Sequence, residues 1–172
     1  MWSSDRRAIL LGLLALPACG FTPVYGPGGV AEGLRGQIAV APPRDEPGYA
    51  FVRQLEDRLG RPADARYDLT SDIRLDRQGL GITTDQETTR FQIDGEATYR
   101  LADRATGAIV ASGEVSNFTA YSAPVVAPGR ASIAGNTVSV QVAEADAVER
   151  LMTILADQLV ARLLATAADW RR

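Results

Sequence analysis

A single cysteine is the residue of this chain with the most definite chemistry. Cys19 follows the sequence Leu-Pro-Ala and an apolar run that begins at Ala8, after two arginines. Basic residues before a short apolar run are the layout of a secretory signal, and this run is far too short to cross a bilayer, which takes about 20 residues. The Leu-Pro-Ala-Cys sequence resembles a lipobox, where a lipid is attached to the cysteine sulfur and the chain is cut. We therefore predict a lipoprotein signal peptide over residues 1–18 and acyl chains, such as palmitate, on Cys19.

The acyl chains would anchor the protein to a membrane. Each buried methylene contributes about 0.8 kcal/mol, and two or three chains hold a protein far more firmly than one. Gly20 follows the cysteine, where an aspartate would signal retention in the inner membrane of enteric bacteria. The sequence thus favours a lipid anchor in the outer membrane, on its periplasmic side.

Other catalytic and ligand chemistry is sparse. The chain has no histidine and no second cysteine, so histidine catalysis and histidine or cysteine metal sites are excluded, and we expect no cofactor. The formal net charge of −3 shows no basic excess, so nucleic acid is not an expected partner. An enzyme would need paired carboxylates such as Asp72 with Asp94, or Asp94 with Glu96. Because carboxylates on exposed strands usually serve solubility, we expect no enzyme.

Alternating apolar and polar residues predict four strands. The first covers residues 37–41, the second 67–76 and the third 90–101. The fourth begins at 109–115, and we expect it to run on through Phe118 to Tyr121 with a change of phase. Gly95 interrupts the apolar face of the third strand, where we expect a bend or bulge. Residues 78–87 read as a loop or as the tip of a long hairpin, and residues 122–136 as a loop.

Apolar residues at spacings of three and four predict two helices. One follows Pro47 and ends at Gly60, with Phe51, Leu55 and Leu59 on one stripe. The other covers residues 143–169. The predicted fold is α+β: a two-layer sandwich in the order β-α-β-β-β-α, with a four-stranded, mostly antiparallel sheet and two helices on one face. We expect residues 1–18 to be the signal peptide, 19–36 a Gly- and Pro-rich acylated tether, and 37–172 a single domain.

The start of the mature chain carries a family resemblance. Residues 19–26, Cys-Gly-Phe-Thr-Pro-Val-Tyr-Gly, resemble the cysteine-glycine-aromatic-x-proline-x-tyrosine-glycine start of the lipopolysaccharide (LPS)-assembly lipoprotein family LptE. Residues 99–101 with 106–107 are similar to that family's third and fourth strands. Residues 145–151 with 155–159 are similar to its closing helix. The likeness covers nearly the whole mature chain.

The resemblance implies a function in building the Gram-negative envelope. LptE-like proteins are non-enzymatic subunits of the LPS translocon. They plug the LptD outer-membrane β-barrel and assist its assembly while LPS is inserted into the outer leaflet. The implied partner is an LptD-type barrel, and LPS is a candidate ligand. The alternative is an auxiliary lipoprotein of an ABC-type lipid-transport system, and a structural lipoprotein without a transport role is a third option.

Arginines are the candidate contacts to LPS or to a barrel lumen, because guanidinium groups bind phosphate and carboxylate bidentately. The alternation places Arg74, Arg90 and Arg100 on the non-core face of the sheet, and Arg77 near the loop. The competing interpretation is that these arginines are solvated strand charges paired across the sheet with Asp72, Asp94 and Glu96.

Overall fold

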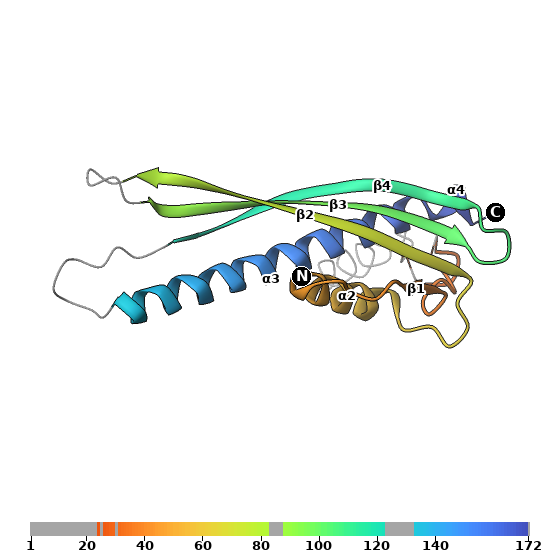
Figure 1. Ribbon diagram of the computed structural model, residues 1–172. Helices are drawn as coiled ribbons and strands as arrows, with labels where there is room; N and C mark the ends of the chain where they lie inside the picture. The colour runs from red at the N-terminus through yellow and green to blue at the C-terminus, as the bar shows by residue number, and fades with distance from the viewer. Residues whose placement is uncertain (1–23, 25, 30, 83–87, 123–132, 172) are drawn as a thin grey trace, which may run out of the picture.

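Three long strands and one long helix give the molecule its elongated shape (Figure 1). The computed structural model describes residue 24 and residues 26–29, 31–82, 88–122 and 133–171. The elements, in chain order, are β1 (Ile38–Val40), α2 (Glu46–Leu59), β2 (Tyr67–Ile82), β3 (Thr88–Asp103), β4 (Ile109–Ser122), α3 (Ile133–Ala165) and the short α4 (Ala167–Trp170). Apart from α4, this is the predicted order β-α-β-β-β-α.

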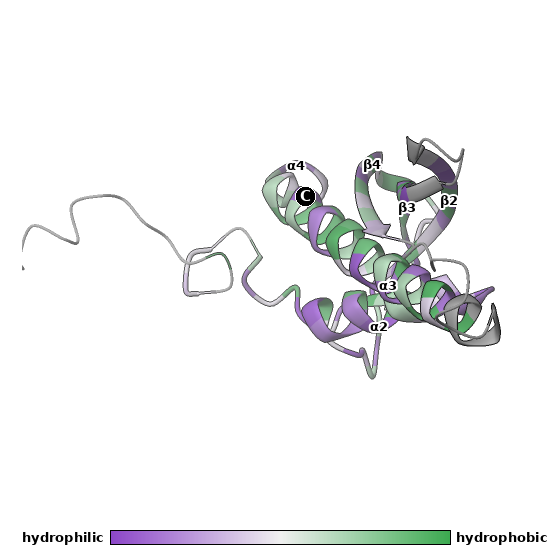
Figure 2. Cartoon of the chain, turned by 90° about the vertical axis from the view of Figure 1, so that its left-hand side faces the viewer, coloured by the Kyte–Doolittle hydropathy of each residue, from purple (hydrophilic) through white to green (hydrophobic). Residues whose placement is uncertain are grey.

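The sheet has the strand order β1-β2-β3-β4. β1 pairs in parallel with β2, and the other pairs are antiparallel. Seen end-on, the helices gather on one side of β2, β3 and β4 (Figure 2). The predicted mixed, mostly antiparallel sheet with two main helices on one face is therefore confirmed.

The alternation of the sequence decides which side of the sheet each residue occupies. Odd-numbered residues of β2 and β3, such as Leu69 and Leu101, face the helices, and the cross-strand register keeps them opposite one another. They form one core with residues of α2 and α3. The largest side chains with almost no exposed surface are Tyr67, Phe51, Leu34, Ile38, Leu55, Leu59, Leu69, Leu101, Leu151, Met152, Leu155 and Leu159.

Strand β4 does not make the predicted change of phase towards Tyr121. Its pairing with β3 is regular from Ala111 to Ser122, and its register shift lies between Ile109 and Ala111. Val115 and Tyr121 therefore both face the helices and are buried, whereas Phe118 keeps the opposite phase and is 59% exposed. An aromatic side chain is thus left on the uncovered face of the sheet.

The hairpin of β2 and β3 is longer than the alternation predicted. β2 continues to Ile82 through register shifts around Gly79, Gly81 and Ile82. Residues 78–82 thus belong to a strand, which agrees with the hairpin interpretation of residues 78–87; residues 83–87 lie outside the described chain.

Helix α2 has clear local signals at both ends. The Asp45 carboxylate accepts a hydrogen bond of 2.8 Å from the Gly48 N–H, which caps the first turn. Gly60 ends the helix with a positive φ of 78°, which glycine adopts without steric cost. Helix α3 begins at Ile133, ten residues before the predicted start, and ends at Ala165.

Residues before β1 already belong to the packed body. Ala31 is fully buried and Leu34 is 1% exposed, both within the core. The Gly36 N–H donates to the Leu59 carbonyl at 2.8 Å, and the Arg171 guanidinium donates to the Glu32 carbonyl at 2.7 Å. The predicted signal peptide, Cys19 and the first residues of the predicted tether lie outside the described residues, so the anchor remains a prediction.

Candidate functional site

The sheet face that the helices leave uncovered is the candidate functional surface. It carries the even-numbered residues of β2, β3 and β4, which meet in rows across the three strands. Four successive rows are Thr70–Arg100–Ser112, Asp72–Thr98–Glu114, Arg74–Glu96–Ser116 and Asp76–Asp94–Phe118. Polar and charged groups dominate this surface, which we call the open face.

Three arginines converge on one half of the open face. Arg74 and Arg100, both predicted as contacts, line a shallow groove of about 750 Å³ together with Arg44 from the loop between β1 and α2. The hydroxyl-bearing residues Thr70, Thr98 and Ser112 line the same groove, as do Asp72 and Glu114. We call it the arginine groove. Guanidinium and hydroxyl groups are suited to phosphate or carboxylate oxygens.

The arginines of this groove are not neutralised by the predicted cross-strand pairs. Asp72 forms an ion pair with Arg44, at 3.8 Å and with both side chains largely exposed. Among the described residues, the guanidinium groups of Arg74 and Arg100 make neither an ion pair nor a hydrogen bond. They are therefore available to an anionic ligand, although the carboxylates nearby limit the net positive charge.

Arg90 and Arg77 lie apart from the arginine groove. Arg90 is exposed on β3, ten residues from Arg100, which corresponds to about 33 Å along a strand. Arg77 occupies an odd-numbered position opposite Ile93, so its side chain lies on the helix side of the sheet. The four predicted arginines thus do not form a single site.

Arg77 instead ties the distal part of the sheet to α3. Its guanidinium donates to Glu144 at 2.8 Å and to the Tyr121 hydroxyl at 3.3 Å, and it lies 5.1 Å from the centre of the Phe91 ring. Tyr121 also donates to Glu144 at 3.1 Å and stacks on Phe91 at 5.3 Å. The hydrogen bond to Glu144 raises the pKa of Arg77, and burial followed by the contact with Glu144 raises that of Tyr121. We call these four residues the α3 clasp.

The other half of the open face combines carboxylates with an aromatic ring. Asp76 lies directly opposite Asp94, which lies opposite Phe118. These residues line a second groove, of about 850 Å³, which also includes Glu96 and, at its border with the arginine groove, Arg74. The open face therefore has an arginine-rich half and an acidic half with an exposed aromatic ring.

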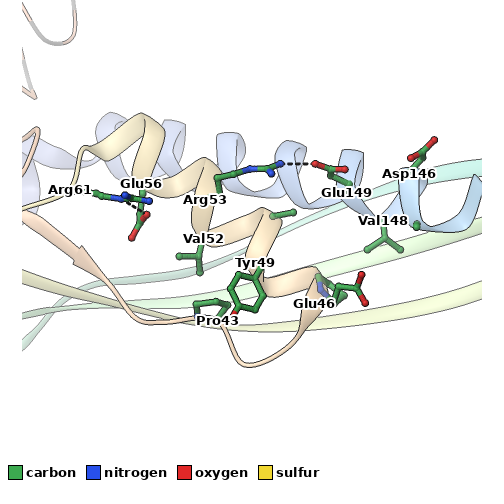
Figure 3. A pocket seen from close by; sticks show the side chains of 13 residues that line it. Pro43, Glu46, Tyr49, Val52, Arg53, Glu56, Arg61, Asp146, Val148 and Glu149 are labelled. Carbon is green, nitrogen blue, oxygen red and sulfur yellow. Dashed lines mark hydrogen bonds and ion pairs between the residues drawn. The ribbon is translucent and has the colours of Figure 1, made fainter. Parts of the chain in front are cut away.

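A third groove lies between α2 and α3 on the helix side (Figure 3). Its lining includes Tyr49, Val52 and Val148, and two ion pairs flank it: Arg53 with Glu149 at 2.6 Å, and Arg61 with Glu56 at 2.7 Å. Its charges are largely paired within the chain, so it offers less to a charged ligand than the open face does.

The carboxylates weighed for an enzyme do not enclose a reaction site. Asp72 lies two rows from Asp94, while Asp94 and Glu96 lie in adjacent rows of the same open surface. In the described part of the chain, no group of three acidic, histidine or cysteine residues is placed to hold a metal ion. Among the helices of that same part, none has the length and apolar character to cross a membrane.

Comparison with known families shows which protein family the chain belongs to. The lipopolysaccharide-assembly family LptE matches residues 36–163, which is well over half of the chain. The chain belongs to the LptE family. This confirms the family predicted from the sequence. The match includes residues 99–107 and 145–159, which carried part of the resemblance, whereas residues 19–26 lie outside it. The family is a non-catalytic one associated with LPS assembly.

Solved structures share the LptE-type fold at low identity. A lipoprotein from Caulobacter crescentus CB15 is 22% identical with a TM-score of 0.62, and the match covers 83% of this chain and 98% of that one. The rare lipoprotein B from Shewanella oneidensis is 11% identical with a TM-score of 0.54, covering 79% of this chain and 98% of that one. These matches support the fold. No curated protein matches the chain.

Three residues of the two open-face grooves were not predicted as site residues from the sequence. Arg44 follows two prolines in a loop, where no periodicity assigns a side to its side chain. The alternation of residues 67–76 puts Asp76 on the non-core face, but its residue type alone does not mark it as a site residue. Phe118 would have been found from uninterrupted alternation in β4, because an even-numbered position there faces away from the helices.

Proposed function

We propose that this protein is an outer-membrane lipoprotein of the LPS translocon, anchored through Cys19, that stands in the lumen of an LptD-type β-barrel. There it plugs the barrel and assists its assembly during the insertion of LPS into the outer leaflet. It acts by binding and not by catalysis. Membership of the LptE family supports the process, and the similarity to structures described as lipoproteins supports the anchor.

The observation that carries the proposal is the polar open face of a long sheet. The interiors of large outer-membrane barrels are polar, and the open face presents hydrogen-bonding and charged groups over most of three strands. β2 and β3 have 16 residues each, or about 53 Å at 3.3 Å per residue. An apolar band of an outer-membrane barrel is about 25 Å tall, so the sheet is long enough to line such a lumen from end to end.

The arginine groove suits the anionic groups of LPS. LPS carries phosphates and carboxylates, and Arg44, Arg74 and Arg100 offer guanidinium groups on one surface. We propose this groove as the LPS contact. Arg90 is retained as a separate barrel-lumen contact, whereas Arg77 acts within the fold.

The test of the partner is a pull-down from native membranes. The full-length acylated protein, with a C-terminal affinity tag, is extracted in mild detergent, and the proteins that copurify are identified by mass spectrometry. We expect an LptD-type barrel in near-stoichiometric yield, and much less of it with Cys19→Ala because that variant lacks the anchor. Recovery of inner-membrane transporter subunits, or of no partner at all, would contradict the proposal.

The test of the arginine groove is LPS binding by the purified protein. We expect the Arg74→Ala, Arg100→Ala double variant to bind immobilised LPS about tenfold more weakly, equivalent to about 1.4 kcal/mol, with a smaller dependence on salt. The control Arg58→Ala removes an arginine on the helix side that pairs with Asp157, and it should bind as the wild type does. Equal binding by all three proteins would rule the groove out as the LPS contact.

A further inference from the structure

One row of the open face combines three features that are each unfavourable for an isolated sheet. The first is a pair of like charges. Asp76 and Asp94 lie directly opposite each other on neighbouring strands, where side chains are about 5 Å apart at their Cβ atoms and like charges destabilise the pair. Amide groups relieve this only in part: Gln78 donates to Asp76 at 3.3 Å and Gln92 donates to Asp94 at 2.8 Å.

The second feature is a buried oxygen without a partner. Asp94 Oδ2 is shielded from solvent and has no hydrogen-bond partner in the described structure. Within the same residues, no arginine lies within ion-pair distance of Asp76 or Asp94, although Arg74 is close by in the next row. Leaving a buried carboxylate oxygen unsatisfied is costly, and charged groups are costlier than neutral ones.

The third feature is the exposed ring of Phe118. It is 59% exposed on β4, an edge strand of the sheet, in the same row as the two aspartates. Several locally destabilising features at one place are expected at a functional site.

A single kind of ligand would relieve all three. A guanidinium or ammonium group between Asp76 and Asp94 would neutralise the like charges. A movement on docking of the side chains that shield Asp94 Oδ2 would also give that oxygen a donor. The ring of Phe118 would receive the apolar stem of that side chain, or its charge by a cation–π contact. We propose that the row Asp76–Asp94–Phe118 docks an arginine or lysine side chain presented by a partner protein.

The charge of the row favours a protein over LPS as its occupant. The groove is lined by three carboxylates, those of Asp76, Asp94 and Glu96, against the single guanidinium of Arg74, so an anionic lipid would be repelled. The row lies six residues from the row of Arg100, or about 20 Å along the strands. The open face is thereby divided into an arginine groove for the anionic ligand and an acidic aromatic row for the protein. The identity of the partner as the barrel wall rests on the proposed function.

The experiment is the same pull-down with variants of the row. We expect Asp76→Asn combined with Phe118→Ala to reduce the copurified barrel at least tenfold. Asp76→Asn alone should keep or raise the melting temperature, because it removes a like-charge contact, so weaker binding would not reflect misfolding. The matched controls, Asp64→Asn on an exposed loop and Tyr49→Ala on α2, should leave the yield unchanged. A photo-crosslinking residue at position 118 should attach to the barrel.

The outcomes separate the two proposals. A barrel that copurifies equally with the wild type and the row variants would overturn the docking row and leave the proposed function intact. Absence of any barrel from the wild-type sample would overturn both. Crosslinking from position 118 to LPS instead of protein would overturn the choice of partner class. A rise in melting temperature with Mg²⁺ or Ca²⁺ that Asp76→Asn abolishes would show a cation site in place of a docking row.

Discussion

Gly95 shows at the scale of one residue how closely α3 approaches the sheet. The pairing of β3 is regular at this position with both neighbours, so the expected bend or bulge is absent. The reason for glycine is contact: a Cβ here would lie 2.9 Å from Leu151 Cδ2 and 3.0 Å from Leu155 Cδ1. Glycine fits at this position because α3 occupies the space that a side chain would need.

Gly95→Ala should therefore destabilise the protein by overpacking, by about 1–3 kcal/mol. Denaturant unfolding followed by circular dichroism measures the change. Leu151→Ala opens a cavity and destabilises the protein on its own, but it should offset part of the effect of Gly95→Ala, so the double variant should be more stable than the sum of the single effects predicts. If the changes in unfolding free energy of the two single variants were strictly additive, Leu151 would not be in close contact with position 95.

Arg77 illustrates a residue whose predicted role and observed contacts differ. It was expected near the loop as an LPS contact, but it bonds to Glu144 and Tyr121 on the helix side of the sheet. The alternation of β2 contains this information, since odd positions of the strand face the helices. An arginine at an inward position near a strand end needs an acidic partner there, and Glu144 of α3 supplies one.

Arg77→Met should loosen the start of α3 without unfolding the domain. The Arg77 and Glu144 side chains are 51% and 35% exposed, so the ion pair contributes only about 0.5–1 kcal/mol. Hydrogen exchange should become faster in residues 138–146, as mass spectrometry can detect. Arg53→Met, which removes the exposed pair with Glu149, is the control and should leave that region unchanged. Identical exchange in both variants would show that the clasp does not hold the helix.

At the scale of elements, prediction succeeded where one side of an element is buried. The strands β2 and β3 and the helix α2 have strict periods because a core covers one side, and their types and order follow from the sequence. The end of β2 and the start of α3 could not be predicted from the sequence. The extra residues of β2 include Gly79 and Gly81, and the first turns of α3 include Asn136 and Thr137, which favour neither element locally.

The turn between β3 and β4 offers a prediction about pH. Asp103 is 9% exposed. Burial alone would raise the pKa of its carboxyl group, but hydrogen bonds from the N–H groups of Ala105 and Thr106 and the guanidinium of Arg66 together lower it. Because the native pKa is depressed, the ionised carboxylate stabilises the fold above the ordinary pKa of about 3.9. That stabilisation is lost as the pH falls through the native pKa.

Asp103→Asn should therefore be less stable than the wild type at neutral pH, and the difference should shrink as the pH is lowered from about 5 towards 3. Melting temperatures across this range measure it. Asp169→Asn, at an exposed position of α4, should follow the wild-type curve. A difference between Asp103→Asn and wild type that is constant with pH would mean that the ionised state of Asp103 does not stabilise the turn.

At the scale of the whole molecule, one end is tightly packed and the other is extended. Near β1, the strands, α2, α4 and residues 31–36 surround the core, with the Tyr67 and Trp170 rings in edge contact at 5.2 Å. Towards the hairpin tip, the sheet and α3 continue beyond α2 (Figure 1), joined by the α3 clasp. With the anchor proposed at Cys19, the polar sheet would extend away from the packed end, an arrangement that suits insertion into a partner.

The packing of residues 31–36 leads to a prediction about where the domain begins. A chain that starts at Val24 should melt as the full mature protein does, because it keeps Ala31, Leu34 and the Arg171–Glu32 hydrogen bond. A chain that starts at Gln37 loses them and should be destabilised by about 3 kcal/mol, mainly from the buried leucine. Urea unfolding of the two purified proteins measures the difference. If Leu34→Ala in the longer chain reproduces most of that loss, the segment is part of the core; if both chains unfold at the same urea concentration, residues 24–36 are only a tether.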